Sequence, residues 1–407
     1  MTTTDPVPRV PAVGSDPRKQ SVVTEPQGKT FFRELDESVI EADRCIQCGT
    51  CVAACPSDSI GIDPVEERPT LVRMCTGCSR CWDFCPRSGL RYERLVAMEA
   101  ADQPDPPEMV AARAIDDDLH HHGQDSGTVT AILASLLETG AIDGALVAMG
   151  SDPPIRGEAY LATSRAELIA ASGSKYNQPM QLGRFHECVD ELDLESPQIA
   201  VVGTPCVIQG AAALERYDWD DEAKPIALTV ALMCTRTFAW DRLETQLGQE
   251  GVDPTSVHRL DVDKGRLSAI DANDEILLET SVDRFDSAAL RGCAECADFV
   301  GGAADISVGN VGSPSGYSTV VLRSARGRDA WEGADSAIET TSLDGPKAVT
   351  RLQEWNHTRA EAALPRPFDP DGSLTITYEA HRSWYDETDR APQALNPARV
   401  YQYEEWC

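Results

Sequence analysis

One cysteine spacing, C-x2-C-x2-C-x3-C-P, occurs twice between residues 45 and 86, and the second copy starts thirty residues after the first. Two-residue gaps allow three thiolates to surround one cubic iron–sulfur cluster, while the fourth cysteine of each copy reaches the other cluster. The spacing therefore predicts two 4Fe–4S clusters in one small module. The predicted ligands of the first cluster are Cys45, Cys48, Cys51 and Cys85, and those of the second are Cys75, Cys78, Cys81 and Cys55.

Two other uses of closely spaced cysteines fit this pattern less well. A zinc site usually takes its ligands in pairs and closes with four, whereas each copy here begins with three cysteines at two-residue gaps. A disulfide framework is typical of short secreted chains, and this chain has 407 residues and no apolar signal at its N-terminus. The module, which we expect over residues 29–97, resembles bacterial-type ferredoxins.

The rest of the chain is long enough for a second domain with a full core. We expect a disordered Pro-rich tail over residues 1–28, an acidic linker over 98–122, a large domain over 123–365 and an irregular tail over 366–407. The linker contains three successive histidines, His120, His121 and His122. Adjacent residues do not share a face of a helix or strand, which favours a loop over a metal site at this position.

The large domain has the pattern of alternating helices and strands. Apolar positions at helical spacing begin after Ser126 and end at Gly140, and Ser164 forms a capping box with Glu167 at the start of a second helix. Strands are expected at 144–149, 198–203 and 226–233, and short antiparallel strands at 256–283. The predicted fold class is α+β, with a small two-cluster ferredoxin module followed by a larger mixed α/β domain.

Four further cysteines are placed where they can converge. Cys206 begins a predicted helix after one strand, Cys234 ends the next strand, and Cys293 and Cys296 form a CxxC pair. Because strand ends of one sheet lie on a common edge, these thiols can hold a third cluster or a zinc ion. A catalytic Cys206 is a further alternative, because a helix N-terminus lowers the pKa of a thiol. The spacing alone leaves these alternatives open.

Six segments together resemble the coenzyme F420 hydrogenase/dehydrogenase beta-subunit family: GQDSGTVTAIL (123–133), SGSKY (172–176), VVGTPCVIQG (201–210), LMC (232–234), CAECADF (293–299) and ADISVGNVG (304–312). The likeness implies a domain that binds FAD and a 4Fe–4S cluster and exchanges hydride with the deazaflavin F420. It also implies that the four cysteines named above hold this cluster. Asn310 departs from the family, in which Asp is common at this position, and no catalytic residue is assigned.

The flavin site is expected at two of these segments. The start of a helix at Gln124–Gly127 offers backbone N–H groups suited to phosphate. Lys175 lies in a Gly/Ser turn, where its ammonium suits a phosphate or the N1–C2 carbonyl edge of a flavin; the alternative is an exposed loop lysine. No GxGxxG follows a predicted strand, so no Rossmann site for NAD is indicated. The candidate cofactor-binding residues are Gln124, Asp125, Ser126, Gly127, Thr130, Ser172, Gly173, Ser174, Lys175, Tyr176, Thr204 and Pro205.

These features together indicate a cytoplasmic F420-dependent oxidoreductase with FAD and three 4Fe–4S clusters. Its expected partner is a redox protein, or subunits of a hydrogenase, dehydrogenase or respiratory complex. Three other functions stay open: a stand-alone flavin and iron–sulfur reductase of an organic substrate, a non-catalytic ferredoxin-like carrier, and a zinc-binding scaffold. No apolar run reaches about eighteen residues, so no membrane segment is expected. The candidate cations for anionic F420 are Lys175, Lys264, Arg266, Arg291 and Arg323.

The charge of the chain is strongly negative, with 36 basic and 67 acidic residues and a formal net charge of −31. The acidic residues are spread along the whole chain, which indicates a solvated surface and argues against nucleic acid as a partner. Only six of the basic residues are Lys. An acidic surface with few lysines is typical of proteins from a salt-accumulating, halophilic cytosol, where salt screens the self-repulsion of the fold.

We therefore expect the fold to depend on salt. Lowering the salt concentration from molar toward about 0.1 M should unfold the protein, because the repulsion between its acidic side chains is then screened less. Far-UV circular dichroism over a series of salt concentrations measures this loss of secondary structure. A melting temperature that does not change with salt would contradict the halophilic interpretation.

Overall fold

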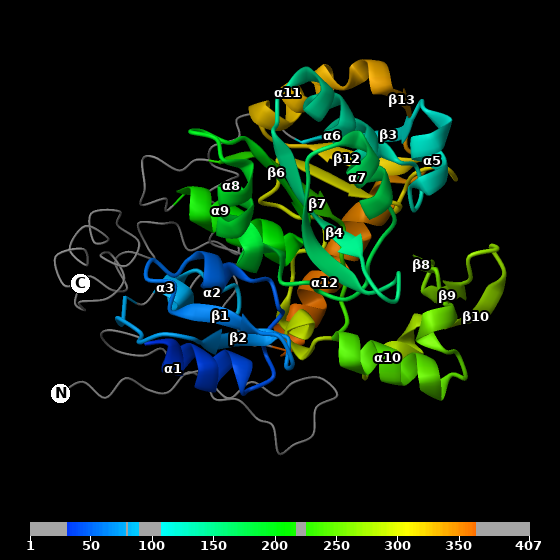
Figure 1. The fold of residues 1–407 in the computed structure, drawn as a ribbon. Coiled ribbons are helices and arrows are strands. Elements are labelled where there is room, and N and C mark those ends of the chain that lie inside the picture. The colour runs from blue at the N-terminus through cyan, green and yellow to red at the C-terminus, as the bar shows by residue number, and fades with distance from the viewer. Residues whose placement is uncertain (1–30, 79, 89–106, 217–224, 364–407) are drawn as a thin grey trace.

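The computed structural model describes residues 31–78, 80–88, 107–216 and 225–363. The expected tails at 1–28 and 366–407, and the first part of the expected linker, lie outside these residues. Figure 1 shows a small N-terminal module at the lower left, beside a larger domain built on a sheet. The predicted α+β class, a ferredoxin-like module followed by a larger α/β domain, is confirmed.

The small module is built around its cysteines rather than around a large apolar core. Its buried cluster combines Phe32, Leu35 and Trp82 with cysteines of both motif copies. A core this small stabilises a fold only marginally, so ligands bound to the cysteines are expected to contribute to folding. The elements of the module are α1 (Phe32–Leu35), a π turn (Asp36–Ile40), α2 (Thr50–Ala53), β1 (Ile60–Asp63), β2 (Arg68–Leu71) and α3 (Arg80–Asp83).

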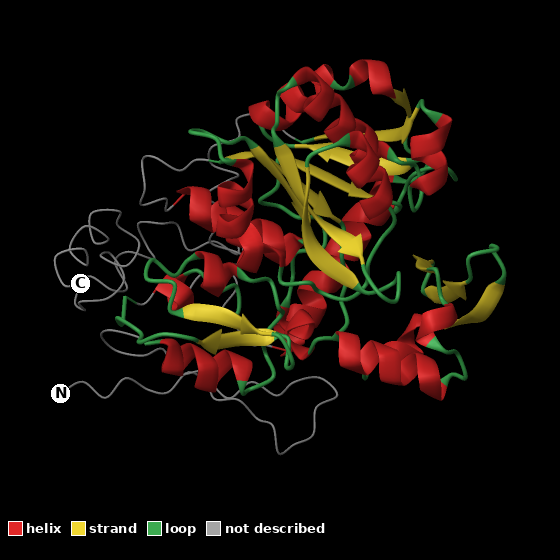
Figure 2. Cartoon of the chain, viewed as in Figure 1, coloured by secondary structure: helices red, strands yellow, loops and turns green. Residues whose placement is uncertain are grey.

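The large domain is organised around one eight-stranded mixed sheet (Figure 2). Its order is β13-β3-β12-β11-β7-β6-β4-β5; β11, β7, β6 and β4 run parallel, and antiparallel strands flank them on both sides. Apolar runs buried on both faces, as in β6 and β7, are typical of central parallel strands. The bounds are β3 (Glu108–Ala114), β4 (Gly144–Gly150), β5 (Gly157–Ala162), β6 (Ile199–Gly203), β7 (Ile226–Leu232), β11 (Ile306–Gly309), β12 (Ser318–Leu322) and β13 (Ile338–Thr341).

Helices cover both faces of the sheet. Helices α6, α7 and α11 pack against side chains such as Val147 and Val230, while α8 and α9 pack on the opposite face against Leu146 and Val201. None of the helices within the described residues is long and apolar enough to cross a membrane. The helices are α5 (Asp117–His122), α6 (Thr128–Thr139), α7 (Arg165–Ala171), α8 (Phe185–Leu192), α9 (Pro205–Arg216), α10 (Trp240–Gln249), α11 (Ala325–Gly333) and α12 (Pro346–Ala363), with 3-10 turns at Gln181–Arg184, Pro254–Ser256, Val282–Phe285, Arg291–Glu295 and Asp335–Ala337.

A separate antiparallel unit follows α10. Its strands are β8 (Arg259–Asp263), β9 (Arg266–Ile270) and β10 (Ile276–Ser281), which confirms the antiparallel group predicted at 256–283. This unit has its own apolar core, in which Phe238 and Phe285 pack with residues of α10. Figure 1 shows it at the right, below the strand ends of the main sheet.

The boundary between linker and large domain differs from the expected one. Residues 108–122 belong to the sheet domain and not to a linker, because β3 pairs with both β12 and β13 and α5 follows it. The Ala-rich sequence of β3 has weak strand propensity, and pairing on both sides decides its structure. The three histidines accordingly lie in α5 and not in a loop, with the Nδ1 of His122 2.8 Å from the carbonyl oxygen of Asp118.

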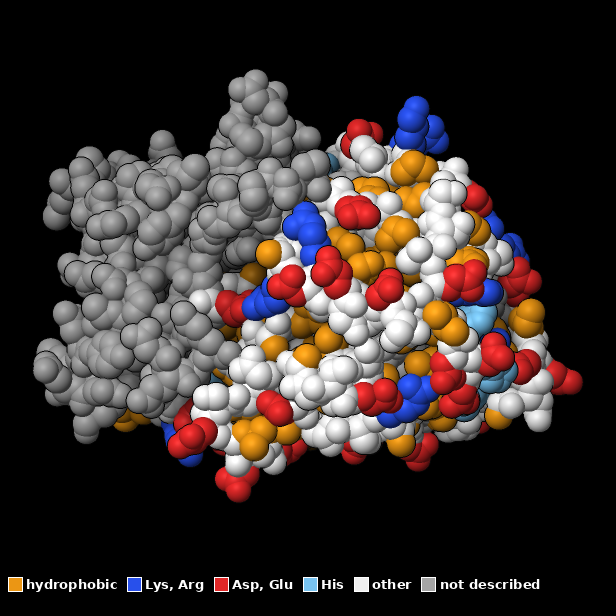
Figure 3. Space-filling view, turned by 90° about the horizontal axis from the view of Figure 1, so that it is seen from above, with side chains coloured by type: hydrophobic (Ala, Val, Ile, Leu, Met, Phe, Trp, Pro, Cys, Tyr) orange, Lys and Arg blue, Asp and Glu red, His pale blue; other side chains and the backbone are white. Residues whose placement is uncertain are grey.

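Acidic side chains are scattered over the face of the molecule in Figure 3, with basic side chains beside several of them. Arg113 and Glu339, for example, form an exposed ion pair with a distance of 2.7 Å between Nη2 and Oε2. Exposed pairs of this kind are screened by salt and stabilise a fold weakly. The stability of the fold therefore depends on its buried contacts.

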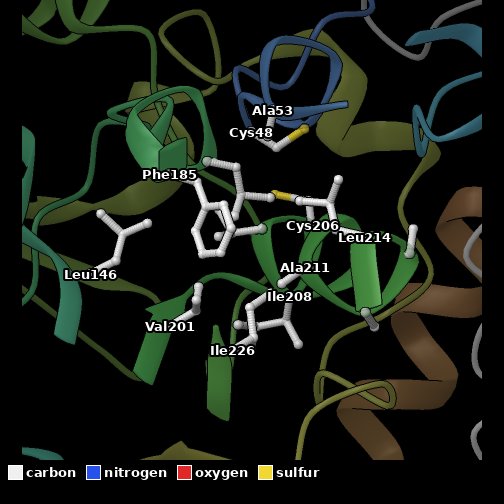
Figure 4. Packing of buried hydrophobic residues seen from close by; sticks show 14 of the residues in the cluster. Cys48, Ala53, Leu146, Phe185, Val201, Cys206, Ile208, Ala211, Leu214 and Ile226 are labelled. Carbon is white, nitrogen blue, oxygen red and sulfur yellow. The ribbon is translucent and has the colours of Figure 1, made fainter. Parts of the chain in front are cut away.

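Buried contacts join the small module to the sheet domain. Arg44, directly before the first cysteine, donates from Nε and Nη2 to the two carboxylate oxygens of Glu295 at 2.8 and 2.7 Å. These two side chains are only 1% and 4% exposed. Figure 4 shows Cys48 of the module in the same apolar cluster as Phe185 and Cys206 of the sheet domain. The two parts of the chain thus share one core.

The contact between α2 and α9 gives a test of this packing. A Cβ added at Gly210 in α9 would overlap the hydroxyl of Thr50 and approach the side chain of Leu182, so we expect Gly210→Ala to lower the free energy of unfolding by about 1–3 kcal/mol. Gly248→Ala in α10 is the matched control. No described atom lies within 4 Å of its added Cβ, so we expect it to raise that free energy by about 0.5–1 kcal/mol. Denaturant unfolding followed by circular dichroism measures both; equal effects would contradict the packing.

Candidate functional site

Four cysteines line one cavity in the small module. The crossover cysteine of the first motif copy meets three cysteines of the second copy there. Backbone N–H groups point at their sulfurs: the nitrogen of Phe32 lies 3.4 Å from Sγ of Cys75, and that of Ser59 lies 3.3 Å from Sγ of Cys55. Donors of this kind stabilise thiolates. The residues around the cavity are Cys55, Ser57, Ile60, Cys75, Thr76, Cys78 and Cys81, which include the full second ligand set that the spacing predicts.

The structure also brings the other ligand set of the module together. Cys51 interacts electrostatically with Cys45, Cys48 and Cys85, and additionally with Cys81 of the second set. Burial, and then the neighbouring cysteines, raise the pKa of the Cys51 thiol well above its usual value. Burial also raises the pKa of Cys45 to about 12. The first and second sets therefore lie side by side within the module.

The four cysteines of the sheet domain form a third set at the ends of its parallel strands. Cys206 lies in the first turn of α9, Cys234 follows β7, and Cys293 and Cys296 lie in and directly after the 3-10 turn at Arg291–Glu295. Cys206 and Cys234 both interact electrostatically with the CxxC pair, and burial is the main cause of their raised pKa values. Cys206 also interacts with Cys48 of the first set. The three sets thus lie in series, with the first set in the middle.

The cysteines of these sets are free thiols. The thirteen cysteines in the described ranges form no disulfide, and burial raises the pKa of several of the thiols, among them Cys51, Cys206 and Cys234. Binding of a metal or a cluster at these sets therefore releases protons. Within the described part of the chain, no group of three or more His, Cys, Asp or Glu side chains is arranged around a single metal ion. An iron–sulfur cluster places its irons and sulfides between the thiolates, which then need not converge on one ion.

Charged residues beside the cysteines were missed by the sequence reasoning. Arg44 precedes the first motif copy, Arg87 follows the second, and Glu295 lies inside the CxxC pair. Arg359 comes from α12, and its Nη2 donates to the carbonyl oxygen of Cys293 at 3.1 Å. A search for charged residues close to the candidate cysteines in the sequence would have found Arg44, Arg87 and Glu295. It would not have found Arg359, which is far from any of these cysteines in the sequence.

Lys175 is half-buried against the hairpin of β4 and β5. A Cβ at Gly157 would lie 2.8 Å from the Cβ of Lys175, so this glycine leaves room for the lysine stem. The ammonium donates to the carbonyl oxygens of Ser172 and Gly173, both at 3.0 Å. Burial lowers the pKa of Lys175 to about 8. It is not an exposed loop lysine, and an anion bound there would stabilise its charge.

Gln124 connects the two candidate flavin segments. Its Nε2 donates to the Tyr176 hydroxyl at 3.2 Å and to Oδ1 of Asp261 at 2.6 Å, and its Oε1 accepts from the nitrogen of Ser174 at 2.9 Å. Burial is the main cause of the raised pKa of the Tyr176 phenol. The segments at 123–127 and 172–176 therefore meet beside β8 of the antiparallel unit.

Asp125 lies beside a second acidic residue. Burial, and then the nearby Asp261, raise the pKa of Asp125 to about 6, while the Asn310 side chain donates a hydrogen bond to it. Asn310 thus contacts this carboxyl group, although the Asp expected from the family is missing. Two carboxyl groups so close together repel a phosphate, which leaves the Lys175 side of this region as the better place for an anion.

Ser126 and Gly127 have structural roles. The hydroxyl of Ser126 is 2.7 Å from those of both Thr128 and Ser318. Gly127 has a φ of 67°, and a Cβ there would overlap the carbonyl group of Leu119. The Ser126 hydroxyl is engaged within the protein and Gly127 has no side chain, so any contribution of these two residues to binding comes from their backbone.

The remaining candidate residues divide between α6 and the third cysteine set. Thr130 is buried within α6. Thr204 has its hydroxyl 3.1 Å from Sγ of Cys206, and Pro205 is the first residue of α9. Gln178 donates to the Thr204 hydroxyl at 3.2 Å and lies 3.7 Å from Sγ of Cys206. Gln178 follows Lys175 by three residues, so one segment leads from the lysine to the third set.

Four of the five candidate cations for F420 are occupied elsewhere. Lys264 and Arg266 form exposed ion pairs on the antiparallel unit. Arg291 donates to a carbonyl oxygen of the small module at 2.6 Å, and Arg323 is buried beside β11. Lys175 is the member of this group that lies with the candidate flavin segments.

Comparisons with known proteins match both parts of the chain. A family model described as the N-terminal part of the beta subunit of coenzyme F420 hydrogenase/dehydrogenase matches residues 109–185, and its C-terminal counterpart matches 197–345. A 4Fe-4S dicluster domain matches residues 38–90. The first match begins within β3, in agreement with the corrected boundary of the sheet domain.

Relatives and a solved structure agree with these matches. An uncharacterized protein of Methanocaldococcus jannaschii is 31% identical over 79% of this chain and 97% of its own length. The coenzyme F420-dependent sulfite reductase of the same organism is 32% identical over 81% of this chain, which spans about half of that relative (51%). A chain of the F420-reducing [NiFe] hydrogenase complex from Methanosarcina barkeri superposes with a TM-score of 0.58 at 27% identity, covering 63% of this chain and 89% of that one. This protein belongs to the coenzyme F420 hydrogenase/dehydrogenase beta-subunit family.

Proposed function

We propose that this protein is an F420-linked oxidoreductase that moves hydride between F420 and FAD and passes single electrons through three 4Fe–4S clusters. The observation that carries the proposal is the series of three cysteine sets, which runs from the small module to the strand ends of the sheet domain. Relatives named for F420-dependent sulfite reduction and F420-reducing hydrogenase support the choice of F420 as the hydride carrier.

The cysteines are suited to clusters by number, position and chemistry. Each set supplies four thiols, and thiolates are the usual ligands of 4Fe–4S clusters. Backbone N–H groups lie beside the sulfurs of Cys55 and Cys75 and would donate to thiolates bound to a cluster. Two cysteines of the second set, Cys75 and Cys78, are partly exposed, against one, Cys45, in the first set. The third set adjoins the first set through Cys206 and Cys48, which leaves the second set as the outer one of the module. We place the contact with a redox partner or partner subunits near the second set for this reason.

The region around Lys175 is suited to a flavin. A bound flavin supplies the exchange between two-electron hydride chemistry and one-electron transfer. Lys175 would bind an anionic group of the cofactor, since its buried ammonium has only two carbonyl oxygens as acceptors in the described chain. Gln124 would hold the segment that carries Lys175 in place through Ser174 and Tyr176. Gln178 would keep this segment against the third cysteine set.

We infer a cytoplasmic location from the fourteen cysteines of the chain, which a reducing compartment keeps as thiols. A reducing compartment also suits iron–sulfur clusters, because their thiolate ligands must not be oxidised. From the acidic surface we further infer that this cytoplasm is rich in salt. Subunits of a hydrogenase or dehydrogenase are the expected partners, in line with the hydrogenase complex that this fold resembles.

Iron content tests the third cluster. Three 4Fe–4S clusters require about twelve irons per chain, and we expect Cys206→Ser to reduce this to about eight because one set loses a ligand. The matched control is Cys188→Ala, which changes a buried cysteine of α8 outside the three sets and should keep about twelve irons. Iron and sulfide analysis of anaerobically purified protein is the measurement. About eight irons before and after the change at Cys206 would mean that the third cluster does not exist.

The electron donor tests the F420 assignment. Reduced F420 should bleach the bound flavin under anaerobic conditions, while NADH and NADPH should not, since the chain has no Gly-rich Rossmann turn. Lys175→Ala should lower the amount of flavin retained and leave the iron content unchanged. Lys264→Ala, whose side chain is 89% exposed, is the control and should retain its flavin. The assay is stopped-flow flavin reduction with each donor at equal concentration.

The outcomes of this assay separate the other functions. Rapid reduction by NADH without a response to F420 would leave a flavin-dependent iron–sulfur reductase of another substrate. A protein with a full iron complement and no flavin would be a ferredoxin-like carrier. A colourless protein that contains zinc would be a scaffold without redox function.

A further inference from the structure

One buried guanidinium lies between the two cysteine sets that meet across the boundary of the domains. Arg87 follows the last cysteine of the module by two residues and is only 3% exposed. Its backbone nitrogen lies 3.4 Å from Sγ of Cys85 in the first set, and its carbonyl oxygen is hydrogen-bonded to Arg44, which in turn binds Glu295 inside the CxxC pair of the third set. The cysteines with which it interacts electrostatically are Cys45 and Cys48 of the first set, and Cys206, Cys293 and Cys296 of the third.

Neighbouring groups fix the position of Arg87. Its Nη1 donates to the carbonyl oxygen of Pro86 at 2.9 Å, and its own carbonyl oxygen accepts from Nη2 of Arg44 at 2.9 Å. Arg44 is itself held by both carboxylate oxygens of Glu295. The ion pair that joins the two domains therefore also holds the backbone of Arg87.

Arg44 donates two hydrogen bonds to a carboxylate, whereas within the described residues the Arg87 side chain donates to a backbone carbonyl oxygen. Glu295 lies near Arg87 as well, but both of its oxygens already accept hydrogen bonds from Arg44. The Nε of Arg87 has no hydrogen-bond acceptor among the described residues. A buried cation without its own carboxylate is costly unless an anion lies close by. Besides Glu295, the anionic groups at this position are the thiolates that cluster binding would form in the two sets.

We propose that Arg87 is a positioning residue whose single charge is shared by the clusters of the first and third sets and raises the reduction potentials of both. A cluster with four thiolates is anionic, and accepting one electron adds one negative charge to it. When one electron passes between these two sets, one cluster is oxidised and the other is reduced, and the total charge beside Arg87 stays the same. The guanidinium keeps its proton throughout, so the transfer needs no proton movement.

Arg359 provides a matched comparison. Its Nη2 donates to the carbonyl oxygens of Thr235 and Cys293 at 2.7 and 3.1 Å, and its charge interacts with Cys234, Cys293 and Cys296 of the third set. Removing its charge should therefore affect one potential, whereas removing that of Arg87 should affect two. The second set of the module serves as an internal control: it adjoins the first set through Cys81 and Cys51, and the arginine whose charge acts on Cys78 is Arg80.

The experiment compares Arg87→Gln, Arg87→Lys and Arg359→Gln in the full-length holoprotein. Reduction potentials are measured by anaerobic titration followed by EPR, and Cys206→Ser assigns the signal of the third set. We expect Arg87→Gln to shift the reduction equilibria of the first and third clusters about tenfold toward the oxidised form, or about 59 mV each, and to leave the second unchanged. Arg359→Gln should shift only the third. Arg87→Lys keeps a charge and should leave the two potentials near those of the parent or move them together.

The results distinguish this inference from the proposed function on which it rests. If the purified protein binds no iron, the assignment of clusters to the three cysteine sets is wrong. Protein with about twelve irons in which Arg87→Gln moves neither potential, or only one, overturns the shared charge and leaves the clusters in place. If Arg87→Gln does not retain its iron, the Lys variant decides: a change confined to one of the two potentials overturns the proposal, and a common response supports it.

Discussion

The buried ion pair between Arg44 and Glu295 joins two residues that are 251 positions apart in the sequence. Moving two charges out of water is expensive, and only good geometry with further hydrogen bonds offsets that expense. Here both carboxylate oxygens of Glu295 accept from one guanidinium, so the pair is satisfied in one relative position of the domains. Loss of either partner would leave a buried charge and lower stability by about 3–5 kcal/mol. The pair therefore contributes more to fixing the position of the module on the sheet domain than to the stability of the fold.

The series of cysteine sets depends on this docking. The first and third sets belong to different domains, and Cys48 interacts with Cys206 only because the module is seated on α9. The interface between the module and the sheet domain is close-packed, because a Cβ at Gly292 would overlap the carbonyl oxygen of Arg44. A shift of the module would separate the sets and remove Arg87 from between them. The same contacts thus hold the fold together and place the redox centres that we propose.

The sequence predicted what is encoded locally. The duplicated spacing predicted which cysteine crosses to the other set, because two-residue gaps leave little freedom, and Cys55 does lie with Cys75 and Cys78. Apolar runs such as the one at 226–233 predicted the central strands. Strand β3 was missed, because its Ala-rich sequence gains its structure from pairing with β12 and β13.

The charged residues between the domains could not be predicted either, because contacts with distant parts of the chain decide their burial, as such contacts decide the structure of β3. Arg44 and Arg87 are ordinary charged residues in the sequence, and their burial becomes visible only when a segment from far along the chain covers them. The third cysteine set was left open on spacing alone, because its members come from α9, the end of β7 and a 3-10 turn. Resemblance to a family supplied what local periodicity does not contain.

The distribution of charge connects the surface to the redox centres. The acids that give the chain a net charge of −31 disfavour reduction of any anionic centre inside, but this long-range repulsion acts through solvent and is screened by salt. Arg87 and Arg359 lie against the cysteine sets, where screening by salt is much weaker. In the role proposed for them, the buried arginines would stabilise an added electron to nearly the same extent in dilute and in concentrated salt. If the proposed clusters are bound, their reduction potentials would therefore depend less on salt than the stability of the fold does.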